Sequence, residues 1–93
     1  MNSITELLTE RGKRYGEFFG HAEVTMQLKS VIRSFCADRD RRMKCDQEEA
    51  LDMICHKIGR ILNGDPDYVD SWDDIAGYAT LVADRLRRNA NPF

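Results

Sequence analysis

Carboxylates at helical spacing occur on both sides of a turn that contains glycine and proline. Glu48 and Asp52 stand four residues apart with Glu49 beside them, and Asp70 and Asp74 repeat the spacing. On a helix this spacing puts each pair on adjacent turns of one flank. Converging carboxylates are the hard oxygen ligands that Mg²⁺ prefers, and phosphates complete its shell. These five acids therefore predict a Mg²⁺ site that could activate water for attack on a phosphoanhydride.

Cationic and aromatic side chains that could bind a nucleotide lie near these acids and near the N-terminus. Lys57 and Arg60 follow the first carboxylate pair, and Lys13 and Tyr15 lie in a segment punctuated by glycines. A cationic side chain neutralises phosphate charge, and an aromatic ring can stack on a base. The segment does not have the glycine-rich pattern of a Walker loop. The predicted phosphate- and nucleotide-binding residues are therefore Lys13, Tyr15, Lys57 and Arg60.

A structural interpretation accounts for many of the same residues and stays open beside the first. Most of the acids lie at or near expected helix N-termini, where carboxylates cap free N–H groups and complement the helix dipole. Lys57 and Arg60 could instead pair with Asp70 and Asp74 and lock two helices together. Asp52 lies in mid-helix, so capping does not explain it.

Hydrophobic periodicity predicts an all-α fold, a small bundle of about four helices without strands. Its C-terminal part, about residues 46–88, reads as a helical hairpin around a turn with Gly64 and Pro66. The predicted helices cover about residues 4–11, 22–37, 46–63 and 70–88. The predicted connections are 12–21 and 38–45, and residues 89–93 are expected to form a frayed tail.

Capping signals set the expected helix ends. Ser3 with Glu6 fits a capping box at the start of the first helix, and Gly12 is placed to end that helix. Asp46 is expected to cap the third helix, with Glu49 closing a second capping box. Asp70 or Ser71 is expected to cap the fourth helix.

Each of the three longer helices carries one apolar stripe, which we expect to form the buried core. The small residues Ala76, Gly77, Ala79 and Ala83 are expected to let a neighbouring helix approach closely. The stripes consist of Val24, Leu28, Val31, Ile32 and Phe35, then Leu51, Ile54, Cys55, Ile58, Ile61 and Leu62, then Ile75, Tyr78, Ala79, Val82 and Leu86.

Length and charge limit the classes of partner. The 93 residues are expected to form one domain, residues 1–93, and a monomer of this size buries little surface, so we expect a homo-oligomer. The net charge of −2 gives no global attraction to nucleic acid or anionic lipid, so neither is an expected partner. Local basic clusters keep nucleic-acid binding only as a third interpretation.

Cysteine usage and the N-terminus indicate the compartment. Cys36, Cys45 and Cys55 are an odd number, and their spacing with the two histidines does not fit a zinc site. The N-terminus has no apolar core of the secretory type, and no apolar run approaches the length of a membrane span. A reducing cytoplasm with free thiols is therefore expected.

The most specific sequence pattern lies in the hairpin. Residues 57–60, KIGR, then Gly64, then residues 70–79, DSWDDIAGYA, resemble a family of small phage and prophage proteins of unknown function. That family has the recurring pattern K-I-x-R, a glycine, then D-x-W-x-D-I-A-G-Y-A. Glu10-Arg11 with Tyr15-Gly16 also resembles the family's opening E-R…Y-G. The resemblance implies a phage-type protein in the host cytoplasm.

This family is in turn distantly similar to the MazG-type all-α nucleoside triphosphate pyrophosphohydrolases, which hold Mg²⁺ with acidic motifs E-x-x-E and E-x-x-D on neighbouring helices. Here the corresponding acids are Glu49 with Asp52 and Asp70 with Asp73. Aspartate replaces glutamate in two places, which shortens the reach, and the phage pattern has its acid at Asp74 rather than Asp73. The similarity implies an Mg²⁺-dependent enzyme that converts an NTP to NMP and pyrophosphate.

Two function hypotheses follow from these residues. The first is the nucleotide pyrophosphohydrolase or a relative of it, with Mg²⁺ as cofactor. The alternative is a non-catalytic interaction module that binds a host protein or a nucleotide. The two differ in whether the acids hold a metal or form caps and ion pairs.

Overall fold

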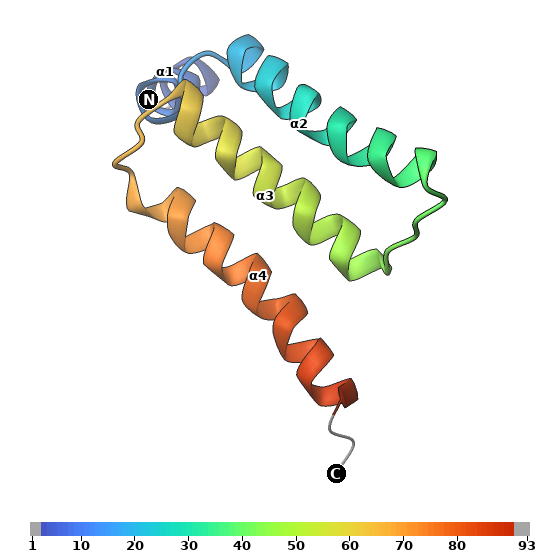
Figure 1. The fold of residues 1–93 in the computed structure, drawn as a ribbon. Helices are drawn as coiled ribbons and strands as arrows, with labels where there is room; N and C mark the ends of the chain where they lie inside the picture. Colours follow the sequence, from blue (N-terminus) through green and yellow to red (C-terminus); the bar gives the residue numbers. More distant parts are fainter. Residues whose placement is uncertain (1–2, 91–93) are drawn as a thin grey trace.

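The computed structural model describes residues 3–90, which contain four α-helices and no strand. These are α1 (Ile4–Tyr15), α2 (Phe18–Asp38), α3 (Cys45–Asn63) and α4 (Val69–Ala90). The predicted all-α class with a C-terminal helical hairpin is confirmed (Figure 1). None of the helices in this range is long and apolar enough to cross a membrane.

The N-terminal connection is much shorter than predicted. Gly12 does not end α1, which continues to Tyr15 and ends at Gly16, where φ is 76°. The Gly16 N–H donates to the Gly12 carbonyl, and α2 begins at Phe18. A glycine inside a helix lowers its stability by only about 1 kcal/mol relative to alanine. The three glycines of this segment therefore do not by themselves require a loop. The predicted connection 12–21 is therefore wrong, and only Gly16 and Glu17 join the helices.

The remaining helix ends differ by smaller amounts. The Ser3 hydroxyl accepts from the Glu6 N–H at 3.2 Å, as predicted. The second connection covers residues 39–44, close to the predicted 38–45. α4 continues to Ala90, so the first two residues of the predicted frayed tail are helical, and residues 91–93 lie outside the described residues.

Asp46 and Asp70 do not act as the predicted caps. Lys44 is the N-cap of α3, and its N–H donates to Gln47 Oε1 at 2.9 Å. Asp46 lies in the first turn of α3, where it forms a bidentate ion pair with Arg85 at 2.6 and 2.8 Å. This bidentate pair directs both carboxylate oxygens of Asp46 to α4. Asp70 lies in the first turn of α4, which begins one residue earlier.

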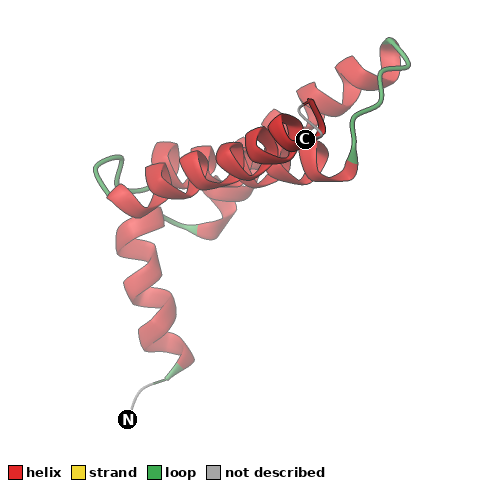
Figure 2. Ribbon diagram, turned by 90° about the horizontal axis from the view of Figure 1, so that it is seen from below, coloured by secondary structure: helices red, strands yellow, loops and turns green. Residues whose placement is uncertain are grey.

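Three helices form one flat layer. α3 packs between α2 and α4, and within residues 3–90 α2 and α4 do not pack on each other. Neighbouring helices run antiparallel, and α1 leaves the layer on one face beside the α3–α4 connection (Figures 1 and 2). A single layer has no second layer of its own chain to cover either face.

The core is therefore not where the apolar stripes predict it. The buried side chains lie along the helix seams and are small or polar, namely Ala50, Cys55, His21, Thr25, Lys57 and Ser71. Of the predicted stripes only Cys55 is buried, whereas Val31 is 69% exposed and Leu62 is 67% exposed. Most of the other stripe residues are half-buried, so the prediction of a fully buried core is wrong for one chain. Apart from Cys55, the stripe residues are partly or largely exposed.

Gly59 sets the distance between α2 and α3. A Cβ atom at this position would overlap Thr25 Oγ1 and lie 2.9 Å from His21 Nδ1. Both neighbours are buried, so neither can move away freely. Gly77 of α4, which was also expected to allow a close approach of helices, has open space around it. No atom would lie within 4 Å of a Cβ at this position.

The two glycines therefore predict opposite effects of the same substitution. We expect Gly59→Ala to lower the free energy of unfolding by about 1–3 kcal/mol, because it overpacks the seam. We expect Gly77→Ala to raise it by about 0.5–1 kcal/mol, because alanine is the better helix former and has room. Urea unfolding followed by circular dichroism at one protein concentration measures both. Equal changes in the two variants would contradict the close approach at Gly59.

Candidate ligand site beneath the first helix

A concavity of about 580 Å³ lies in the angle between α1 and the layer. Its walls come from α1, the first turn of α2 and the last turns of α3. The side chains that matter for binding are Leu8, Arg11, Tyr15, Phe18, His56 and Arg60. The volume falls within the range of about 300–1,000 Å³ found for small-molecule sites.

Asn63 holds the helices that form the concavity. Its Nδ2 donates to the carbonyl oxygens of Tyr15 at 2.9 Å and Glu17 at 2.7 Å, just where α1 turns into α2. Gly16 and Gly20 lie directly against Asn63, with no room for a side chain. One amide at the end of α3 thus fixes the entry of both other helices.

Two guanidinium groups give the concavity a positive character. Arg60 lies over the Tyr15 ring at 4.2 Å from the ring centroid. Within residues 3–90 neither Arg60 nor Arg11 has a carboxylate partner, and Glu17 is the one acid in the lining. Uncompensated guanidinium groups favour an anionic ligand.

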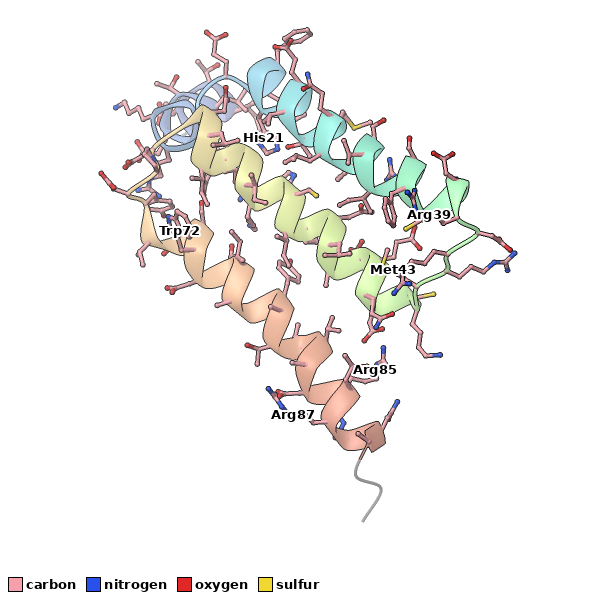
Figure 3. All side chains as sticks on the ribbon, in the orientation of Figure 1. His21, Arg39, Met43, Trp72, Arg85 and Arg87 are labelled. Atoms are coloured by element: carbon pink, nitrogen blue, oxygen red, sulfur yellow. The ribbon has the colours of Figure 1, made fainter. Side chains whose placement is uncertain are left out.

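A pair of histidines forms the inner wall. His21 Nε2 and His56 Nδ1 are 3.2 Å apart, and the rings meet edge to face (His21 is seen between α2 and α3 in Figure 3). Burial lowers the pKa of His21, and the positive charge of Arg60 lowers it further. Burial, with the neighbouring His21 and Arg60, lowers the pKa of His56 from 6.5 to about 4. Both rings are therefore neutral at pH 7 and share one hydrogen bond.

The histidine pair is a feature that the sequence analysis missed. The two residues are 35 positions apart and belong to no motif. Neither histidine belongs to one of the predicted apolar stripes, so periodicity does not indicate that they are buried. Only the packing of α2 on α3 brings them together.

The predicted phosphate-binding residues divide into two groups. Tyr15 and Arg60 meet in the concavity as described. Lys57 is buried in the α3–α4 seam, with Nζ 2.8 Å from Asp74 Oδ2, and Lys13 lies exposed on the last turn of α1, outside the lining. The ion pair of Lys57 with Asp74 corresponds to the structural interpretation of Lys57, in which it locks two helices together.

The predicted metal-binding acids do not form one group. Asp52 faces α2, where Arg33 lies 3.6 Å away, whereas Asp74 reaches Lys57 across the opposite seam. Asp70 accepts a hydrogen bond from the Tyr68 hydroxyl at 2.9 Å. In the described part of the chain no three histidine, cysteine, aspartate or glutamate side chains are placed to hold a metal ion. Glu48 and Asp52 lie on the α2 side of α3, whereas Asp70 and Asp74 lie on α4, on its other side.

Glu48 and Asp52 do lie together, in a second concavity of about 310 Å³ between the end of α2 and the start of α3. Arg33, Arg41 and Arg42 line the same concavity. Glu49 is exposed and lies outside it. This site therefore combines two of the five predicted acids with three guanidinium groups.

Comparison with protein families, with curated proteins and with solved structures finds no match to this chain. The fold and the two concavities define an all-α protein with a cationic, aromatic-lined cavity. The function proposed below rests on that geometry.

The low pKa of His56 predicts a pH dependence of stability. The unfolded chain binds a proton at His56 near pH 6.5, but the folded chain binds it only near pH 4. Unfolding therefore takes up protons between these values, and the free energy of unfolding falls as the pH drops from 6.5 to 4. We expect a loss of about 2 kcal/mol across this window, less than the full shift implies because the ring is partly exposed.

Urea unfolding at a series of pH values measures this loss, and an NMR titration of the imidazole measures the pKa itself. His56→Gln is expected to flatten the dependence between pH 6.5 and 4. Aspartate and glutamate side chains titrate at about pH 4, at the lower end of this window, in both proteins, so the difference between wild type and variant isolates the histidine contribution. An unchanged slope in the variant would show that the histidine pair is not its cause.

Proposed function

We propose that the protein is a non-catalytic module that binds a nucleotide-like ligand, an aromatic ring carrying phosphate, in the concavity beneath α1. The observation that carries the proposal is the pairing of Arg11 and Arg60, without carboxylate partners in the described residues, with an aromatic wall of suitable size. Guanidinium groups bind phosphate oxygens in a bidentate manner. Phe18 offers an exposed ring for stacking on a base.

Binding rather than catalysis is supported by the histidine pair. A general acid or base works best with a pKa near the operating pH. The pKa of His56 is about 4, well below that value. Because His21 Nδ1 is buried, His56 Nε2 is the ring nitrogen left to bind the edge of a base.

We place the protein in the cytoplasm. Cys36, Cys45 and Cys55 are all free thiols. Free thiols persist in reducing compartments, and this supports the location. A phage-type origin, proposed from the resemblance of residues 57–79, would make this the host cytoplasm.

Neighbouring phenylalanines provide a matched test of the ligand site. Phe18 lines the concavity and is 78% exposed, whereas Phe19 is 74% exposed and lies outside the lining. We expect Phe18→Ala to weaken nucleotide binding about 5- to 100-fold and Phe19→Ala to leave it unchanged. Isothermal titration calorimetry with ATP, GTP, adenosine and inorganic triphosphate measures the affinities.

The charged part of the site is tested in the same titrations. Arg60→Gln is expected to weaken ATP more than adenosine, because it removes a phosphate contact. Arg87→Gln is the control, since Arg87 pairs with Asp84 on the exposed surface of α4. The proposal is sunk if none of the four compounds binds the wild-type protein at millimolar concentration.

A second candidate function is the Mg²⁺-dependent pyrophosphohydrolase, and the second concavity favours it. Mg²⁺ is often held by one or two carboxylates together with substrate phosphates, and Glu48 and Asp52 offer such a pair. Arg33, Arg41 and Arg42 would neutralise the triphosphate. Glu48 and Asp52 would hold the metal, and a bound Mg²⁺ would activate water for hydrolysis of an NTP to NMP and pyrophosphate.

Pyrophosphate release distinguishes the second candidate from the first. We expect turnover of at least one NTP or dNTP with Mg²⁺, lost in Asp52→Asn and retained in Asp70→Asn. Asp70 contacts Tyr68 on the far side of the molecule from the second concavity, so it is a suitable control. Absence of release from the full nucleotide panel at micromolar enzyme would exclude this activity.

A further inference from the structure

The three apolar stripes lie on one face of the layer. The contacts of α3 fix its orientation, because Lys57 and Asp46 reach α4, Asp52 reaches α2, and His56 lines the concavity on the α1 side. At 100° per residue, Ile58 lies about 200° around the axis from His56, on the side away from α1. Leu51, Ile54 and Leu62 share that side with Ile58.

The outer helices continue the same surface. Their contacts with α3, through His21 on α2 and Asp74 and Arg85 on α4, orient them in the same way. The stripes on the side away from α1 define the apolar face, whose residues are Val24, Leu28, Val31 and Phe35, then Leu51, Ile54, Ile58 and Leu62, then Trp72, Ile75, Ala79, Val82 and Leu86. In the described helices the one charged residue turned to this face is Asp38, the last residue of α2.

The opposite face has the reverse composition. Lys29 and Arg33 of α2, Glu49 and Arg60 of α3, and Asp70 of α4 lie there by the same geometry. It also carries α1 and the ligand concavity. The layer is thus amphipathic as a whole, as a single surface helix is in an ordinary domain.

The exposed area measures how incomplete one chain is. A compact monomer of 10.8 kDa exposes about 5,500 Å². This chain exposes 7141 Å². The excess of about 1,600 Å² exceeds the roughly 800 Å² that each partner contributes to a stable interface.

We propose that the apolar face is the interface with a second copy of this chain. Two flat layers stacked face to face give the two-layer arrangement that a single chain does not have. A twofold contact of this face is self-complementary, because it brings the apolar residues of both copies together. Each copy has a net charge of −2, and the contact keeps the two charged faces on the outside. The ligand concavity lies on the opposite face, so the interface leaves it open and is independent of the proposed function.

Two exposed aliphatic residues on opposite faces allow a matched test. Val31 on the apolar face is 69% exposed in one chain, and Leu81 on the charged face is 67% exposed. An aspartate at either position is accommodated by a single chain, but only Val31→Asp would bury a charge in the dimer. We expect Val31→Asp to weaken dimerisation at least about 100-fold and Leu81→Asp to leave it unchanged.

Sedimentation equilibrium at about 50 μM gives the mass, with twice 10.8 kDa expected for the wild type and for Leu81→Asp. The fluorescence of Trp72, the only tryptophan, gives a second readout, because Trp72 lies on the apolar face and its emission should shift to the blue on dimerisation. A Val31→Asp variant that is monomeric, or unfolded while Leu81→Asp stays a folded dimer, supports the proposal. A folded wild-type monomer, or a Val31→Asp variant that remains dimeric, overturns the proposal. A folded monomer is also the result expected if the apolar face binds another protein.

Discussion

The close approach of α2 and α3 at Gly59 is the constraint on which the layer depends. His21 and Thr25 lie where a side chain at position 59 would stand, so the two helices touch through small and polar groups. The α3–α4 seam uses the same kind of contact, with Ser71 buried and Lys57 paired with Asp74. Because polar and small residues fill the seams, the apolar stripes are turned away from them.

This division gives each face of the layer a separate role. The apolar face has the composition of an interface, whereas the charged face carries the concavity beneath α1. Asn63 serves the charged face, since it fixes α1 to the end of α3 and thereby shapes the concavity. The proposed assembly and the proposed ligand binding therefore use different faces and do not compete for surface.

The charged residues show how far sequence reasoning reaches. Helical spacing correctly places Glu48 beside Asp52, and both line one concavity. It does not show that Asp74 lies across the other seam, where it offsets the buried charge of Lys57. A buried ammonium needs such a partner, so the pairing takes Lys57 away from any phosphate. Arg60 keeps its charge for a ligand because its neighbour is the Tyr15 ring.

The sequence by itself determined the helices and their apolar stripes, because periodicity and capping act between residues three or four positions apart. The C-terminal hairpin was predicted correctly from the sequence, but the connection 12–21 was not. The glycines there lower helix stability only slightly, so most of the segment is helical. Only the tertiary structure decided which side of each helix is covered. The meeting of His21 with His56 and the exposure of Val31 depend on contacts between distant residues, and no local pattern encodes these.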